Sequence, residues 1–146
     1  GETKEGDLIE VPRWVAEAFA ELGFAEVQEE NFEVEMLKAL SRERIQGSNQ
    51  LSTLTGDFYL KLKRHLDCLK ENTPSRGASK HDYDEAYLKA LDLITLRTVK
   101  LLPLTVGEYT PDIMQKVTPE ELKLFNMVRE MVQRWKRTVL EGSGDE

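Results

Sequence analysis

The sequence predicts an all-α protein, a helical bundle of about five helices preceded by a short, reduced β segment at the N-terminus. Apolar residues recur at steps of three and four over most of the chain, as one face of a helix requires. Only DLIEV, residues 7–11, alternates polar and apolar residues as a strand does. Further on, TPEE at residues 118–121 places an N-cap Thr, a first-turn Pro and a capping-box Glu in order.

The first two predicted helices are short. One begins near Pro12 and ends at Gly23, a residue that favours the position after a helix. Residues 24–30, FAEVQEE, are expected to form a brief extended piece, and Asn31 can then cap a second helix. That helix carries Phe32, Met36, Leu37 and Leu40, and it should end before Gly47.

A third helix is predicted within LSTLTGDFYLKLKRHLDCL, residues 51–69, with Thr55 or Asp57 as its N-cap. One helical stripe holds Phe58, Leu62, Leu66 and Leu69. The helix should stop near Asn72 and Pro74. The loop NTPSRGASKHD that follows, residues 72–82, is rich in Ser, Gly, Pro and charge, so we expect it to be mobile.

A long helix is predicted from Asp82 and another from Thr118, joined by a connection at residues 103–117 that includes one short helical turn. The residues at core spacing in the long helix are Tyr83, Tyr87, Leu91, Ile94 and Leu101, and Leu88, Ala90, Leu93, Leu96 and Val99 widen its apolar arc. The last helix carries Leu122, Phe125, Val128, Val132, Trp135 and Val139 before the flexible acidic tail EGSGDE. One neighbour cannot cover arcs of this breadth, so the surplus predicts an interface with another chain.

Composition narrows the class of protein. The chain has 27 acidic and 20 basic residues and a net charge of −7, which disfavours a domain built chiefly to grip phosphate backbones. Its single cysteine, Cys68, allows no internal disulfide and suits a reducing compartment. No apolar run approaches the length of a membrane span, so we expect no contact with a membrane.

Metal and catalytic motifs are incomplete. His65 and Cys68 share a helical face, but no second cysteine or paired histidine completes a four-ligand zinc site. A thiol enzyme would need Cys68 with His65 or His81 in a cleft, and nothing in the sequence places them there. We therefore expect no enzyme activity, no metal and no cofactor.

Two basic clusters surround aromatic residues and are candidates for contact with nucleic acid. One is Lys61, Lys63 and Arg64, beside Phe58 and Tyr59; the other is Arg134, Lys136 and Arg137, around Trp135. Because Trp135 shares a stripe with apolar residues, it is expected in the core or in an interface, and DNA contact is a secondary property. A helical nucleic-acid-binding protein is nevertheless the alternative hypothesis.

The order of motifs resembles a subunit of GINS, the assembly that joins the MCM ring and a RecJ-like factor in the replicative helicase (the CMG complex) of archaea and eukaryotes. The resemblance runs from about residue 7 to residue 140. It rests on GDLIEVPRWVAEAFAELGFAEV, on DFY at residues 57–59 opening a helix, on Arg97 and Lys100 in LRTVKLL, and on VTPEELKLF. Each piece is short, and their order along the chain is the stronger signal.

The resemblance implies a non-catalytic scaffold in DNA replication, which supports initiation and fork progression. DLIEVPRW precedes the helical part, as in the class of GINS subunit whose small β domain comes first. Residues 1–30 would then be a remnant or truncated small β/α segment, residues 31–140 the helical domain, and residues 141–146 the acidic tail. Only one or two strands fit before Pro12, which departs from the several strands usual in that small domain.

The resemblance also implies partners and a location. The partners would be sister GINS subunits in a hetero-oligomer, the MCM helicase and a RecJ-like factor, with DNA polymerase or primase as further candidates. The protein would lie in the nucleus of a eukaryote or in the cytoplasm of an archaeon. The residues expected in the core or in a subunit interface are Trp14, Phe58, Tyr59, Leu91, Ile94, Leu122, Phe125, Val128, Val132 and Trp135.

Overall fold

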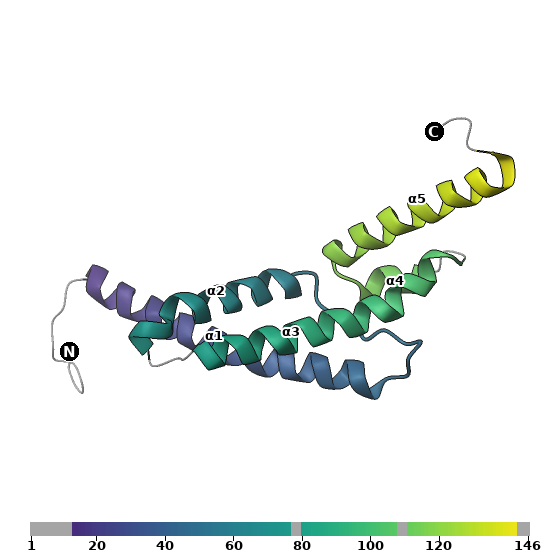
Figure 1. Cartoon of the computed structure of the whole chain (residues 1–146). Helices are drawn as coiled ribbons and strands as arrows, with labels where there is room; N and C mark the ends of the chain where they lie inside the picture. The colour runs from purple at the N-terminus through teal and green to yellow at the C-terminus, as the bar shows by residue number, and fades with distance from the viewer. Residues whose placement is uncertain (1–12, 77–79, 108–110, 143–146) are drawn as a thin grey trace. The chain divides into compact units, whose positions relative to one another are not determined.

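The computed structural model describes residues 13–76, 80–107 and 111–142 (Figure 1). Within these ranges it has five α-helices, one 3-10 helix and no strand. The predicted all-α fold is therefore confirmed. The strand predicted at residues 7–11 lies outside the described residues, as does most of the acidic tail. The chain divides into two compact units, Gly1–Val34 and Glu35–Glu146.

The first helix, α1, is a single element from Arg13 to Ile45, so the prediction of two helices separated by an extended piece is wrong. The helix continues through Gly23 and through FAEVQEE. One glycine inside a helix costs only about 1 kcal/mol, and the neighbouring Ala, Glu, Gln and Leu residues are strong helix formers with no proline among them. Its end lies where the polar break at Gly47 was predicted to fall.

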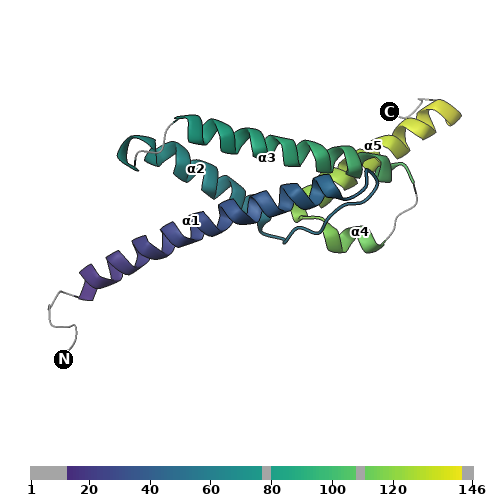
Figure 2. The same cartoon turned by 90° about the horizontal axis from the view of Figure 1, so that it is seen from below.

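Helices α2 (Phe58–Arg76) and α3 (Lys80–Leu101) are antiparallel and lie side by side in both views (Figure 1 and Figure 2). The α2 helix begins where DFY was predicted to open it, and the Asp57 carbonyl accepts the backbone N–H of Lys61 at 3.0 Å. It ends later than predicted, because Pro74 removes a single backbone donor in a turn that is already the last. The predicted mobile loop is thus helical up to Arg76, and residues 77–79 lie outside the described part.

The connection to the last helix contains the short 3-10 helix η1 (Leu102–Thr105) and the helix α4 (Pro111–Lys116), in agreement with the predicted short helical turn. The last helix, α5, spans Pro119–Glu141. Its capping box is complete, since the Thr118 hydroxyl accepts the Glu121 N–H and the Glu121 carboxylate accepts the Thr118 N–H, both at 3.1 Å. The predicted start of this helix is confirmed.

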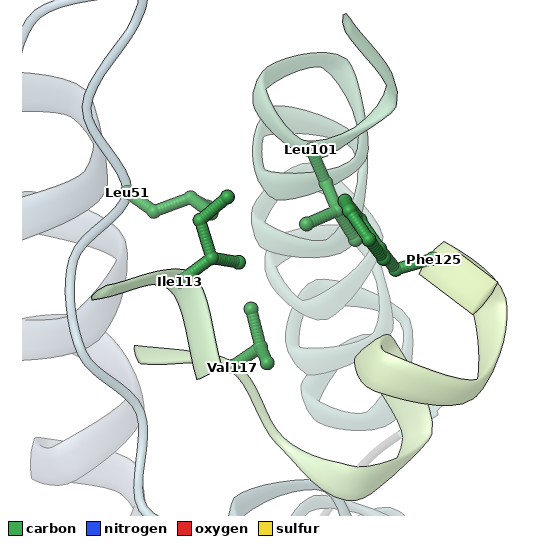
Figure 3. Packing of buried hydrophobic residues seen from close by; sticks show 5 residues of the cluster. All are labelled: Leu51, Leu101, Ile113, Val117 and Phe125. Atoms are coloured by element: carbon green, nitrogen blue, oxygen red, sulfur yellow. The ribbon is translucent and has the colours of Figure 1, made fainter. Parts of the chain in front are cut away.

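A compact apolar cluster joins these connections to the helices. Leu51, from the segment before α2, meets Leu101 of α3, Ile113 and Val117 around α4, and Phe125 of α5 (Figure 3). A backbone hydrogen bond from the Leu54 N–H to the Lys116 carbonyl, at 3.1 Å, holds the same two connections together. The cluster fixes where the first half of α5 lies against the end of α3.

The buried face of α3 is not the predicted one. Its buried residues are Ala86, Ala90, Leu93, Arg97, Lys100 and Leu101. Of the residues predicted at core spacing, Tyr87, Leu91 and Ile94 are exposed, whereas Leu101 is buried. The predicted face is exposed because Arg97 and Lys100, on the other side of the helix, have carboxylate partners inside the bundle. Burying these two cations turns the large apolar side chains toward solvent.

Candidate functional site

The interior of the second unit is organised around Arg97, whose side chain is 1% exposed. Its Nε and Nη2 atoms donate to the two carboxylate oxygens of Glu121, at 2.6 and 2.9 Å, and Nη1 donates to Glu43 at 2.8 Å. The remaining guanidinium hydrogens reach the carbonyls of Ser52 and Lys116, at 2.8 and 3.1 Å. All five guanidinium N–H donors therefore have acceptors within the chain.

Lys100 lies one helical turn beyond Arg97 and completes the charge balance. Its Nζ donates to the Glu43 carboxylate at 2.8 Å and to the Glu43 carbonyl at 2.7 Å. The Ser52 hydroxyl donates to the same carboxylate at 2.5 Å. Burial raises the pKa of Glu43, but the hydrogen bonds from Lys100, Ser52 and Arg97 outweigh burial and hold the pKa below its usual value.

Glu121 receives a further bond from α2. The Tyr59 hydroxyl donates to its Oε2 at 2.6 Å, and burial together with the Glu121 charge raises the pKa of Tyr59, so the hydroxyl keeps its proton. Burial lowers the pKa of Arg97, but the hydrogen bonds and charges of Glu121 and Glu43 raise it by more. The net pKa is therefore raised, and Arg97 stays charged. We call Glu43, Ser52, Tyr59, Arg97, Lys100 and Glu121 the ion cluster.

The ion cluster works as a structural tie. It has two cations and two anions, and each charge is paired with at least one opposite charge. Its residues come from α1, the segment before α2, α2, α3 and α5, so the cluster joins these elements. Three sequence motifs far apart along the chain meet in it: DFY through Tyr59, the Arg97 and Lys100 pair, and TPEE through Glu121. Sequence reasoning missed Glu43 and Ser52 as partners, and the available signal was two cations three residues apart in the last part of α3, residues 93–101, which has no other charged residue.

Opposite its buried side, α3 presents a row of large apolar side chains to solvent. We call this row the outer face of α3: Tyr87, Leu88, Leu91, Ile94 and Val99, between 39% and 64% exposed. Beside it lies a groove of about 490 Å³ between α2, α3 and the start of α5, lined mainly by Tyr59, Leu62, Leu66, Tyr83, Ile94 and Leu124. Large contiguous apolar patches are uncommon on the surface of a protein that acts alone.

The predicted core and interface residues fall into three groups. Phe58 and Phe125 are each 1% exposed and belong to the core. Tyr59, Leu122, Val128 and Val132 are half-buried. Trp14, Leu91, Ile94 and Trp135 are exposed, so a core position is wrong for these four, and an interface position stays a prediction.

The two basic clusters lie on the surface, but neither forms a single cationic face. Lys61 is paired with Glu35 and Asp57, and Lys63 is paired with Asp67 at 3.0 Å. Arg64 is exposed, as are Arg134, Lys136 and Arg137. Consecutive helical residues point 100° apart, so the three cations of the second cluster surround Trp135 rather than lining up beside it.

The thiol and the two histidines differ in their exposure. His65 is buried at 4% exposure, Cys68 is half-buried, and His81 is exposed beside Glu85. Within the described ranges no group of three or more His, Cys, Asp and Glu side chains could hold a metal ion. In the same part of the chain, no helix has both the length and the apolar character needed to cross a membrane.

Comparison with protein-family models, with curated proteins and with solved structures gives no match to this chain. The candidate site is therefore described by its geometry alone. The ion cluster lies on one side of α3, and the apolar outer face lies on the other.

Proposed function

We propose that the chain is a non-catalytic scaffold subunit of a GINS-type complex in DNA replication, which links the MCM helicase to a RecJ-like factor. The observation that carries the proposal is the outer face of α3, with five large apolar side chains exposed on a helix whose other side is tied by the ion cluster. A rigid helix with an apolar outer face suits permanent subunit packing, in which the partner completes the core.

The order of motifs gives the family within this proposal. DFY, the Arg97 and Lys100 pair, and TPEE carry the resemblance, and they are neighbours in the ion cluster. If these side chains must contact one another to stabilise the fold, the subunits of such a family would retain all three motifs. The choice of the class with the small β domain first rests on residues 7–11, which lie outside the described part, and stays a prediction.

Co-expression with candidate sister GINS subunits, followed by mass measurement of the purified complex, tests the proposal. We expect a stable hetero-oligomer whose interfaces bury roughly 2,000 Å² or more in total, the range of permanent assemblies. Leu88→Glu with Leu91→Glu should split the complex without changing helicity. Leu60→Glu is the matched control, because Leu60 is 60% exposed on a different helix, α2.

Two results would overturn the scaffold function. One is a monomer at high micromolar concentration that binds none of the sister subunits. The other is tight, steeply salt-dependent DNA binding by the isolated chain that is lost in Arg134→Ala with Arg137→Ala, which would favour the nucleic-acid-binding alternative.

A further inference from the structure

The apolar stripe of α5 has the spacing of a coiled-coil seam. Phe125, Val128, Val132, Trp135 and Val139 follow one another at steps of three, four, three and four. These steps are those of heptad positions a and d, which keep one face of a helix against a partner. The α5 helix is drawn from light green to yellow in Figure 1.

The two ends of this seam differ in burial. Phe125 is 1% exposed in the apolar cluster, whereas Trp135 is 65% and Val139 is 59% exposed. Every residue from Arg134 to Gly142 is exposed. The same heptad pattern thus begins inside the bundle, passes through the half-buried Val128 and Val132, and ends at Trp135 and Val139, which the described part of the chain leaves exposed.

The charged residues along the second half of α5 are mostly basic, and one of these cations, Arg134, is paired with Glu130 at 3.9 Å. Between residues 129 and 141 the charged residues are Arg129, Glu130, Arg134, Lys136, Arg137 and Glu141, an excess of cations in a chain with an excess of acids. With Val132 at position a, Lys136 occupies position e, where a side chain meets position g of a parallel partner or position e of an antiparallel one. Arg129, the preceding e residue, already donates to the Gly107 carbonyl at 2.8 Å.

We propose that the second half of the α5 seam, the half-buried Val128 and Val132 and the exposed Trp135 and Val139, forms a two-helix coiled coil with an amphipathic helix of another protein that carries Glu or Asp at its flanking positions. A second copy of this chain lacks that chemistry. Its e residues are Arg129 and Lys136, and its g residues are Leu124, Met131 and Thr138, so no carboxylate faces Lys136 in either orientation.

Nucleic acid also fits this surface less well than a helix does. Arg134 and Lys136 lie 100° to either side of Trp135, so the middle of the face is apolar and the cations straddle it. A phosphate backbone is better met by cations gathered on one side of a helix. The inference rests on the proposed function only in that both take the chain to act through protein contacts.

The test uses the full chain with the substitution Trp14→Phe. The chain has two tryptophans, so this variant reports the fluorescence of Trp135 alone. The probe is a synthetic peptide of about 21 residues, three heptads, with Leu at positions a and d and Glu at e and g. We expect the Trp135 emission to shift to the blue on titration with this peptide. A matched peptide with Lys at e and g should leave the emission unchanged.

A pair of neighbouring variants locates the binding surface. Val139→Ser lies in the seam and should weaken binding by about tenfold or more. Leu140→Ser should bind like the parent, because Leu140 is 82% exposed but points 100° away from Val139. Circular dichroism checks that both variants keep the parent's helicity.

Four results would overturn the inference: no shift with the Glu peptide, equal shifts with both peptides, a shift that depends on protein concentration without peptide, or a shift with duplex DNA alone. The third result would assign the seam to a second copy, and the fourth would assign it to nucleic acid. If sister subunits assemble while the Glu peptide fails, only this inference is lost. If the peptide binds while no sister subunit assembles, only the proposed function is lost.

Discussion

Arg97 is the residue on which the interior of the second unit depends. A buried charge is costly unless it is paired and hydrogen-bonded, and here Glu43 and Glu121 supply both the opposite charge and the geometry. Each of the two carboxylates also has a second partner, Lys100 for Glu43 and Tyr59 for Glu121. Removal of the guanidinium would therefore leave two buried carboxylates with too few donors.

The substitution Arg97→Met tests this dependence at a similar side-chain length. We expect the free energy of unfolding to fall by about 3–5 kcal/mol, because breaking one side of a buried ion pair leaves uncompensated charge. Urea denaturation followed by circular dichroism measures the change. Arg64→Met on the surface of α2 is the control and should stay within about 0.5 kcal/mol of the parent. Equal effects of the two substitutions would contradict a structural role for the cluster.

Glu43 makes the stability depend on pH. Its pKa in the folded chain lies below the ordinary value of 4.5, so the unfolded chain takes up the proton first as the pH falls. The stabilisation from Glu43 is thus fully present above about pH 4.5 and is lost as the pH falls through the folded pKa. The difference in free energy of unfolding between the parent and Glu43→Gln should narrow as the pH falls.

Denaturation at a series of pH values between about 7 and 3 checks this prediction. The surface control is Glu130→Gln, because the Glu130 side chain is 74% exposed. A gap between the parent and Glu43→Gln that does not change with pH would contradict the assigned role of the Glu43 charge.

Within the helix α5, two kinds of interaction fix the N-terminal end, and both use Glu121. Glu121 completes the capping box with Thr118, and the same carboxylate binds Arg97 and Tyr59. The local start signal of the helix is thereby coupled to its tertiary position, so α5 cannot shift along its axis without losing its cap partner or its ion pair.

The substitution Thr118→Ala removes the hydroxyl of the cap and should cost about 1–2 kcal/mol of stability. Thr118 is fully buried, so water cannot replace the lost acceptor at the Glu121 N–H. Thermal or urea unfolding measures the loss. Thr118→Ser should restore most of the stability, and Thr138→Ala, at an exposed position of the same helix, should change it by less than about 0.5 kcal/mol. A Ser variant as unstable as the Ala variant would refute the capping explanation.

At the scale of the whole molecule, the two aromatic residues of α5 have opposite environments although they share one stripe. Phe125 lies in the apolar cluster, whereas Trp135 is exposed in the single chain (Figure 3). The sequence predicted both for the core or an interface, and only Phe125 lies in the core. For the isolated protein, truncation of the two rings should therefore have very different costs.

We expect Phe125→Ala to lower the free energy of unfolding by about 3–5 kcal/mol, because it leaves a cavity among Leu51, Leu101 and Val117. Trp135→Ala should cost less than about 1 kcal/mol in the isolated chain. Urea denaturation of both variants gives the comparison. If Trp135→Ala were as destabilising as Phe125→Ala, the exposed position of Trp135 would be wrong.

Helices whose signals are local could be predicted from the sequence. The capping box at Thr118, the helix start after Asp57 and the turn-rich connection before α4 all depend on residues within a few positions of one another. The same local reasoning failed at Gly23 and Pro74, because a single unfavourable residue does not break a helix that its neighbours support, or that is ending anyway.

The buried face of α3, in contrast, depends on contacts between residues far apart in the sequence. The spacing of apolar residues along the helix predicts that Tyr87, Leu91 and Ile94 lie in the core. The partners that draw Arg97 inward lie 54 and 24 residues away, at Glu43 and Glu121, and no local pattern links them. Pairing these charges in the interior turns the apolar arc outward, so the surface proposed for partner binding follows from ion pairs that the periodicity could not reveal.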